Sequence, residues 1–403
     1  MDITTYLKQL ARQKASDLFL SVGAPPGIKI EGQTHHLGYA PLTAKEVEDM
    51  AHELMNEEQR LQFAQTMEMN LARAEAGIGR FRINIYRQRG EVAIAIRYIT
   101  DRIPGIEELN LPPILKDLIM LPRGLVLIVG STGSGKSTAL ASMIDYRNER
   151  MTGHILTVEE PVEYLHTHKE SIVDQREIGL DTMSYANALK NAMREAPDVI
   201  MIGEIRDRET MQAAISYAET GHLCLSTLHS NNANQTLERI INFFPEIARP
   251  QLLLDLSLNL QAVVSLRLLQ GVGGHRVPAV EILLRSPYVS DLIAKGEVDQ
   301  LKEAMKMAVD RGMQTFDESL YRLYRDGKIT FEEAIEHADS RTDLQLRIRL
   351  SGDEAGNAPS DQAGEMRIEA EPVPDKSGEG GIWIADSLGS AQKPGTPGKA
   401  RLG

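Results

Sequence analysis

The chain has 403 residues, a formal net charge of −13 and a single cysteine, Cys224. Its size predicts two or three domains, and its 42% hydrophobic and 25% charged residues are typical of a soluble globular protein. One cysteine excludes a disulfide scaffold and a four-cysteine zinc site within the chain. The acidic charge argues against nucleic-acid binding. No apolar run is long enough for a transmembrane segment and the start lacks a signal-peptide core, so we expect a cytoplasmic protein.

Residues 1–100 predict a small α+β domain. A helix is expected near residues 4–18, a hairpin turning at Gly32 over 27–37, and a pair of helices over 43–66. Two strands are expected over 79–99, on either side of Gly90. Residues 101–119 contain three prolines and predict a linker followed by a helix.

Residues 120–345 predict an α/β domain. Apolar runs at 125–129, 154–158, 198–203 and 224–228 alternate with helical segments such as 184–195 and 208–219. Such alternation predicts a mostly parallel sheet with helices on both faces. The part from 271 to about 345 is expected to be all-helical. Residues 346–403 are assigned to a disordered tail, because Gly, Pro, Ser and acidic residues dominate most of this stretch.

The sequence GSTGSGKST, residues 130–138, matches the phosphate-binding pattern G-x-x-x-x-G-K-[ST]. Its glycines let backbone N–H groups point at phosphate oxygens, Lys136 offers a positive charge to the β- and γ-phosphates, and Ser137 offers a hydroxyl to Mg²⁺. A strand-like run precedes the loop and a helix-compatible run follows it. The predicted cofactors are ATP and Mg²⁺, and the predicted nucleotide-binding residues of this loop are Gly130, Ser131, Thr132, Gly133, Ser134, Gly135, Lys136, Ser137 and Thr138.

Acidic residues follow two of the predicted strands, at the edge where open α/β sheets bind ligands. Glu204 follows the strand at 198–203, whereas Asp198 begins it, roughly 20 Å away at about 3.3 Å per residue. Glu204 is therefore predicted to bind Mg²⁺ directly or through water. Glu159, Glu160 and Glu163 follow the strand at 154–158, and one of them is expected to activate the attacking water. Spacing alone does not choose among the three.

Two histidines and two arginines complete the candidate set. His229 follows the strand at 224–228 on the ligand side, and His222 precedes that strand. In GRFRINIY, the alternation of a strand places Arg80 and Arg82 on one face. This arginine pair is either part of a solvated surface or is offered in trans to the nucleotide of a neighbouring subunit.

Seven blocks of the chain resemble the type IV pilus retraction ATPases of the secretion-ATPase superfamily, the PilT/PilU family, and are most similar to its PilU type. The blocks are ASDLFLSVGAPPGIKIEG, GRFRIN, GSTGSGKST, ILTVEEPVEYLH, APDVIMIGEIRDRET, ETGHLCLSTLHSNNA and GMQTFDESL. The similarity as a whole covers residues 1 to about 345. The resemblance implies a PAS-like N-terminal domain, a RecA-like ATPase domain and a homo-hexameric ring. It also implies a peripheral position at the inner membrane, docked on the platform protein of the pilus machine.

The resemblance also assigns roles to individual residues. The catalytic glutamate of the family falls on Glu163 and its Walker B glutamate on Glu204. The remaining catalytic candidates are Arg80, Arg82 and His229, and the second family histidine, His222, joins the nucleotide-binding set. The acidic box departs from the family pattern at Glu160, where Asp is usual.

A second departure concerns residues 288–295, YVSDLIAK, where main retraction motors carry AIRNLIRE. The apolar positions remain, but two arginines are replaced by Ser290 and Ala294. Asp291 and Lys295 are spaced to pair with each other. An arginine fork that can hold an acidic partner is therefore missing, which predicts an intact ATPase that works with a PilT-type partner motor.

The predicted function is thus an ATP-hydrolysing, hexameric motor subunit for type IV pilus retraction and twitching motility. Two alternatives stay open. One is a non-motor accessory ring that binds ATP and docks the partner motor, and the other is a RecA-like nucleic-acid translocase. Pilus extension ATPases also resemble this chain, but they typically carry paired CxxC zinc motifs that one cysteine cannot form.

Overall fold

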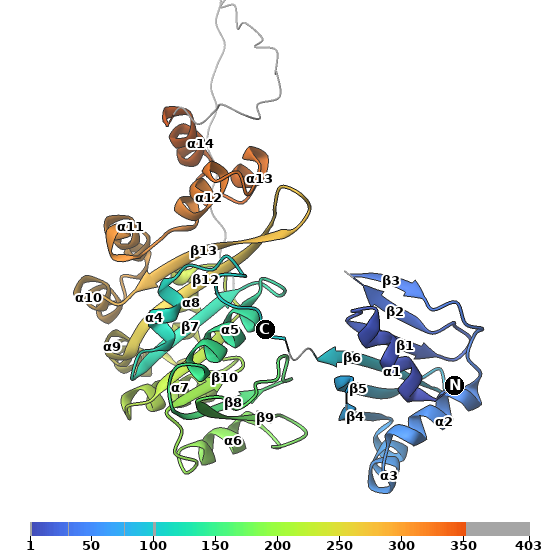
Figure 1. Ribbon diagram of the computed structural model, residues 1–403. Helices are drawn as coiled ribbons and strands as arrows, with labels where there is room; N and C mark the ends of the chain where they lie inside the picture. Colours follow the sequence, from blue (N-terminus) through green and yellow to red (C-terminus); the bar gives the residue numbers. More distant parts are fainter. Residues whose placement is uncertain (1, 31, 76, 100–101, 352–403) are drawn as a thin grey trace, which may run out of the picture. The chain divides into compact units, whose positions relative to one another are not determined.

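The computed structural model describes residues 2–30, 32–75, 77–99 and 102–351 (Figure 1). The predicted disordered tail lies outside the described residues from 352 onward. Two β-sheets divide the described chain into an N-terminal domain and a larger second domain. None of the described helices combines the length and apolar character that crossing a membrane requires.

The N-terminal domain is built on a six-stranded antiparallel sheet of order β3-β2-β1-β6-β5-β4. Its core lies on one face of the sheet, where the alternation of β5 buries Phe81, Ile83 and Ile85 as predicted. β4 was not among the predicted strands, since its sequence, EMNLARAE, is half polar. The elements are α1 Ile3–Arg12, β1 Asp17–Ser21, β2 Gly27–Ile30, β3 Gln33–His36, α2 Ala44–Leu54, α3 Glu57–Thr66, β4 Glu68–Glu75, β5 Gly79–Gln88 and β6 Glu91–Ile99. The PAS-like character of this domain stays a prediction.

The second domain has a seven-stranded sheet of order β13-β12-β7-β11-β10-β8-β9. All neighbouring strands pair in parallel except β12 and β13, which form an antiparallel hairpin. The expectation of a mostly parallel sheet is confirmed. The strands are β7 Gly124–Gly130, β8 Gly153–Glu159, β9 Ser171–Glu177, β10 Val199–Ile202, β11 Leu223–Leu228, β12 Leu260–Gln270 and β13 Arg276–Leu284.

Helices cover both faces of this sheet, because its central strands bury side chains on each side. One face packs against α4 (Ile114–Ile119) and α5 (Lys136–Asn148), and the other packs against α6 to α11. Polar caps fix several helix starts; for example, Asp207 accepts the backbone N–H of Thr210 at the start of α7. The helices of the second face are α6 Tyr185–Ala192, α7 Arg208–Glu219, α8 Ala233–Asn242, α9 Arg249–Asn259, α10 Pro287–Lys295 and α11 Leu301–Met307, with short 3₁₀ turns at Glu246–Ala248, Val298–Gln300 and Val309–Arg311.

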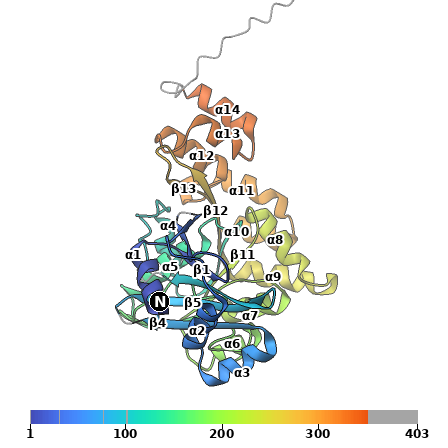
Figure 2. The same cartoon turned by 90° about the vertical axis from the view of Figure 1, so that its right-hand side faces the viewer.

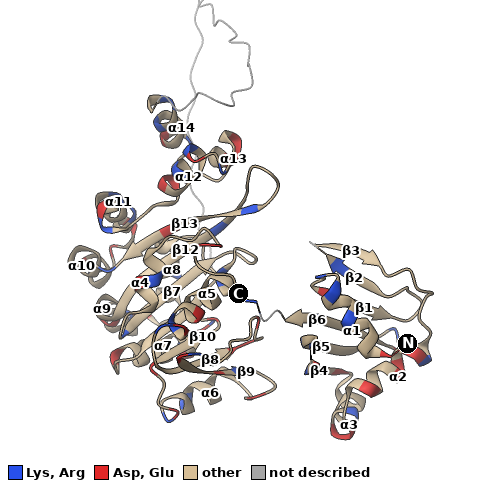
Figure 3. Cartoon of the chain, in the orientation of Figure 1, with Lys and Arg blue, Asp and Glu red and all other residues tan. Residues whose placement is uncertain are grey.

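Three helices follow at the far end of the hairpin: α12 Phe316–Arg325, α13 Phe331–Glu336 and α14 Arg341–Leu350. Figures 1 and 2 show them gathered beyond β13, and they share a core with Leu269, Val277 and Ala279 of the hairpin. Acidic and basic residues are interspersed along α11 and α12 (Figure 3).

Two expectations for the end of the chain need correction. The segment from 271 to 345 is not all-helical, since VPAVEILL is an apolar run of strand length that pairs along β12. Helix α14 runs on to Leu350, past the boundary expected at residue 345, because Leu344 and Ile348 are both buried in the C-terminal core.

Candidate active site

The phosphate-binding sequence lies where it was predicted, between the buried strand β7 and helix α5. Gly130 has a φ of +153°, and a Cβ there would lie 2.3 Å from Ser134 Oγ and 2.6 Å from the carbonyl oxygen of Leu266. Gly135 precedes α5 in the left-handed conformation, with a φ of +91°. Neither position tolerates a side chain without strain, so the glycines allow the tight loop at the helix N-terminus.

Lys136 is held by the loop that it belongs to. Its side chain is buried, and Nζ donates hydrogen bonds to the carbonyl oxygens of Gly130 at 3.0 Å and Ser131 at 2.8 Å. Burial lowers the pKa of Lys136, while the nearby charges of Glu204 and Glu163 raise it. The electrostatic effect of both carboxylates on Lys136 indicates that the three side chains share one site.

Strand register explains why these residues meet. Ile202 of β10 pairs with Val158 of β8 and Ser226 of β11, and Leu228 pairs with Val129 of β7. Parallel strands in this register end at a common edge. The segments that follow β8, β10 and β11 therefore surround the phosphate-binding loop.

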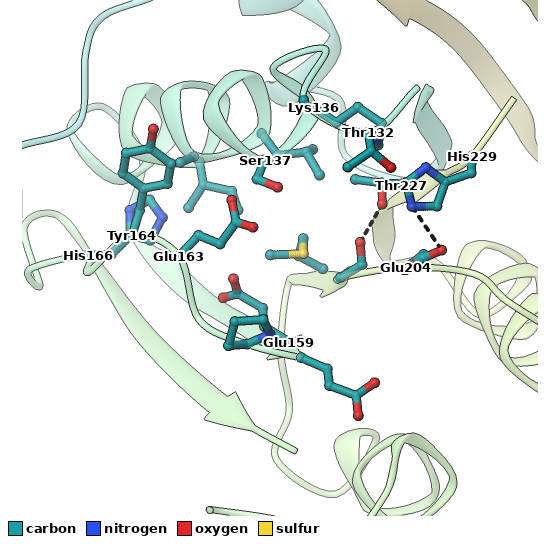
Figure 4. A pocket seen from close by; sticks show the side chains of 18 of the residues that line it. Thr132, Lys136, Ser137, Glu159, Glu163, Tyr164, His166, Glu204, Thr227 and His229 are labelled. Atoms are coloured by element: carbon teal, nitrogen blue, oxygen red, sulfur yellow. Dashed lines mark hydrogen bonds and ion pairs between the residues drawn. The ribbon is translucent and has the colours of Figure 1, made fainter. Parts of the chain in front are cut away.

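A pocket forms at this edge, and Figure 4 shows Glu163 pointing into it, toward Ser137. Four glutamates line the pocket together with Lys136 and His229. Polar groups of the loop and of β11 complete the lining on the other side. The residues named in the sequence predictions that line it are Thr132, Gly133, Lys136, Ser137, Glu159, Glu160, Glu163, Glu204 and His229.

Glu204 is contacted by the side chains of Arg206 and His229. Its carboxylate accepts a hydrogen bond from Arg206 Nε at 2.9 Å, and His229 Nε2 lies 3.3 Å from its other oxygen. Arg206 also donates to Glu160 through its Nη1, at 2.6 Å. Arg206 therefore links Glu160, where the family usually has the shorter Asp, to Glu204, the Walker B glutamate.

Glu159 differs from the other acids because it is buried. It accepts hydrogen bonds from Thr157 Oγ1 at 2.7 Å and from Gln175 Nε2 at 3.2 Å. Burial raises the pKa of Glu159 to about 7, against the effect of these hydrogen bonds. Near neutral pH this carboxyl is therefore only partly ionised, and its protonated form cannot accept the proton of the attacking water.

The chain matches known proteins over most of its length. A family model described as "Type II/IV secretion system protein" matches residues 81–313. The chain is 51% identical to the type IV pilus ATPase PilU of Pseudomonas aeruginosa over 354 residues, which span 88% of this chain and 93% of that protein. The chain belongs to the PilT/PilU family of type IV pilus retraction ATPases. Identity to the retraction ATPase PilT of the same organism is 40% over 338 residues, or 84% of this chain and 98% of that protein.

Solved structures agree with membership of the PilT/PilU family. The pilus retraction motor PilT with bound ADP superposes with a TM-score of 0.80 at 41% identity, covering 86% of this chain and 99% of that one. The Legionella pneumophila ATPase DotB gives a TM-score of 0.70 at 26% identity, covering 86% and 95% of the two chains. This chain is therefore an ATPase with the RecA-like fold of the PilT/PilU family.

Three residues from the sequence predictions lie elsewhere. Arg80 and Arg82 are on β5 of the N-terminal sheet, and no salt bridge or side-chain hydrogen bond holds either of them within the described residues. His222 stands just before β11, at the opposite end of that strand from His229, and Thr220 Oγ1 lies 3.1 Å from its Nδ1. Because the nucleotide edge is at the other end of β11, the structure does not bring His222 to the pocket.

The pocket also contains residues that the sequence did not single out. Tyr164 and His166 line it beside Glu163, and Tyr185 and Thr227 line it near Glu204. Tyr164 is anchored to the phosphate-binding loop, since its hydroxyl lies 2.9 Å from that of Thr138. The sequence could have indicated Tyr164 and His166, because both belong to EYLH and directly follow the acidic residues 159–163.

Proposed function

We propose that this chain is a motor subunit for type IV pilus retraction, which hydrolyses ATP in the pocket between the phosphate-binding loop and the acidic box. The observation that carries this proposal is the joint placement of Glu163 and Glu204 opposite Lys136 and Ser137. The relatives support the pilus role: one is the type IV pilus ATPase PilU, and a 40% identical protein of Neisseria gonorrhoeae is named a twitching motility protein.

In this proposal each residue of the pocket has its own role in binding or hydrolysing ATP. Lys136 and the loop N–H groups bind the β- and γ-phosphates. The Ser137 hydroxyl and the Glu204 carboxylate both line this pocket and offer oxygen ligands, which suit Mg²⁺. When bound, Mg²⁺ neutralises phosphate charge as it develops in the transition state. Glu163 accepts the proton of the attacking water, and His229 holds Glu204 in place.

The adenine base is assigned to a second pocket, on the other side of the loop. Gly135, Thr138 and Ala139 form its floor, so it is contiguous with the phosphate site. Its walls are largely apolar, as a stacking site for a base requires. The apolar lining residues are Leu109, Leu111, Leu266, Leu268 and Pro278, and the polar residues Glu108, Asn110, Ser134 and Arg276 also line the pocket. The approach of Leu268 to Gly135 brings this wall directly beside the loop.

Arg80 and Arg82 are proposed to act in trans, in a homo-hexameric ring. Both arginines are partly exposed on β5 and are not held by salt bridges among the described residues. A guanidinium that forms no salt bridge among the described residues is available to phosphate oxygens, which it binds with its planar fork of donors. Each site would then take its arginines from the N-terminal domain of a neighbouring subunit and its remaining groups from its own second domain.

Helix α10 supports the proposal that this chain cooperates with a PilT-type partner motor. Asp291 and Lys295 form a salt bridge at 2.6 Å, as their spacing predicted, and both side chains are exposed. The charge of Lys295 is thus paired with that of Asp291. Ser290 and Ala294 carry no positive charge that could bind an acidic partner. We therefore propose that the ATPase works alongside the partner motor, at the platform protein on the cytoplasmic side of the inner membrane.

Labelled pili in living cells test this proposal. Retraction should depend on the partner motor: deleting it should abolish retraction even when this chain is expressed normally. Robust retraction by this chain alone would refute the dependence on a partner and leave a free-standing motor. ATP turnover by the purified chain that rises on addition of DNA would instead favour the translocase.

A further inference from the structure

Glu163 lies on a connection without helix or strand, residues 160–170, between β8 and β9. Its side chain is exposed, so packing of the side chain itself does not fix its position. A general base must be held within hydrogen-bond reach of the water that it activates. The main chain around Glu163 therefore has to be held by other residues.

The side-chain amide of Gln175 supplies such a hold. Its Oε1 accepts the backbone N–H of His166 at 2.8 Å, and its Nε2 donates to the carbonyl oxygen of Tyr164, also at 2.8 Å. The two hydrogen bonds lie on either side of Leu165. The Gln175 amide therefore pairs with one backbone N–H and one backbone carbonyl of the segment that follows Glu163. Gln175 itself is in β9 and pairs in register with Thr157 of β8.

The same amide reaches the buried acid of the pocket. Gln175 Nε2 lies 3.2 Å from Glu159 Oε1, which also accepts the hydroxyl of Thr157. On the other side of the segment, the Tyr164 hydroxyl bonds to Thr138 in the first turn of α5. The residues next to Glu163 are thus tied to the sheet by Gln175 and to the phosphate-binding loop by Tyr164.

Other contacts hold the two ends of the connection. Glu177, two residues along β9, accepts the backbone N–H of Val162 at 3.3 Å. Asn148 of α5 donates to the carbonyl oxygen of Thr167 at 2.7 Å. Between these two points, Gln175 holds the main chain at Tyr164 and His166, and the Glu159 carboxyl, to which Gln175 also donates, interacts with the backbone N–H of Glu163.

We propose that Gln175 is a positioning residue for ATP hydrolysis, which sets the placement of Glu163 relative to the phosphate-binding loop. This inference rests on the proposed role of Glu163 as the base. It assigns to Gln175 an effect on the rate of the chemical step and not on nucleotide affinity, because Gln175 does not line the pocket itself.

The Gln175→Glu variant tests this inference, because the new oxygen would face two acceptors, the Tyr164 carbonyl and the Glu159 carboxyl. At about pH 8 we expect kcat to fall between roughly tenfold and a hundredfold, since a displacement of about 1 Å can cost that much. On lowering the pH to about 6, the introduced carboxyl takes up a proton and donates again, so kcat should recover. The KM for ATP should stay within about twofold of wild type.

Three further variants complete the design. Gln175→Leu makes neither hydrogen bond and should lose kcat at every pH. The double variant Glu159→Gln, Gln175→Glu exchanges the two groups, so that the amide at position 159 can donate to the carboxylate at position 175. It should regain part of the kcat that Gln175→Glu loses, even if Gln175→Glu alone folds poorly. Gln65→Glu, an exposed glutamine of the N-terminal domain, is the matched control and should behave as wild type.

A Gln175→Glu profile parallel to that of wild type, or a raised KM with unchanged kcat, would overturn the positioning role. Glu163→Gln is assayed alongside to distinguish the role of Glu163 as the base from the role of Gln175 in positioning it. If that variant turns over ATP normally, both the base assignment and the role of Gln175 are wrong. If it is inactive while Gln175→Glu keeps full activity at about pH 8, the failure is confined to Gln175.

Discussion

Replacing Glu281 by glutamine is expected to make the stability of this protein less sensitive to pH. Glu281 lies in the middle of β13 with only 2% of its surface exposed. Its Oε1 accepts the backbone N–H of Ala233 at 2.8 Å and the hydroxyl of Ser265 at 2.9 Å. The carboxyl thus joins the hairpin to the first residue of α8, the helix that follows the loop carrying His229.

Burial raises the pKa of Glu281 from its ordinary value of 4.5 to about 7. Below pH 4.5 both the folded and the unfolded chain hold the proton, so the group does not change the free energy of unfolding. Between pH 4.5 and about pH 7 the unfolded chain releases the proton while the folded chain keeps it, so the free energy of unfolding falls as the pH rises. At 1.36 kcal/mol per pKa unit, the loss amounts to about 3 kcal/mol.

The assay is denaturant unfolding of the wild type and of Glu281→Gln at about pH 5 and about pH 8. Glutamine keeps the acceptor for Ala233 and Ser265 but cannot ionise. The stability of the variant relative to wild type should therefore rise by about 2–3 kcal/mol from the lower to the higher pH. Glu238→Gln, at an exposed position of α8, is the control and should show no such change. A difference between Glu281→Gln and wild type that is the same at both pH values would refute the reasoning.

Three predictions concern the nucleotide site. Lys136→Ala should lower ATP turnover by about a hundredfold or more, since the phosphates lose their fixed cation; near-normal turnover at saturating ATP would contradict the site. Glu163→Gln should bind fluorescent ATP but not hydrolyse it, whereas Glu160→Gln should keep most of its activity; the reverse pattern would exchange their roles. Wild type mixed with an Arg80→Ala, Arg82→Ala variant should show a non-additive loss of ATPase activity, and a strictly proportional loss would place both arginines outside the intersubunit site.

The sequence predicted those parts of the site in which the functional residues directly follow the strand that positions them. The glycines and Lys136 of the loop follow a buried strand and open a helix, so both the loop and its setting are visible in one short stretch. Glu204 could be separated from Asp198 because only one end of a parallel strand faces the ligand. The structure confirms this, with Glu204 in the pocket and Asp198 bonded to the backbone N–H of His154.

The parts that sequence did not predict depend on contacts between distant segments. Strand β9, SIVDQRE, is an edge strand in which polar residues outnumber apolar ones and Ile172 is exposed, so its pattern is weak, and Gln175 was missed with it. Strand β13 was missed because an apolar run of this length, here containing Pro278 and the buried Glu281, does not by itself distinguish a strand from a buried helix. Glu281 is tolerated there only because Ala233 and Ser265 satisfy its carboxyl, and neither is close to it in the sequence.

The contribution of ATP hydrolysis by this chain to pilus retraction is tested most directly by the retraction speed of labelled pili in cells. The cells should keep the PilT-type motor and carry Glu163→Gln in their sole copy of this chain. A motor role predicts slower or rarer retraction than in wild-type cells, because the variant binds ATP without hydrolysing it. Retraction at the wild-type speed and frequency would contradict the claim and leave an ATP-binding accessory ring.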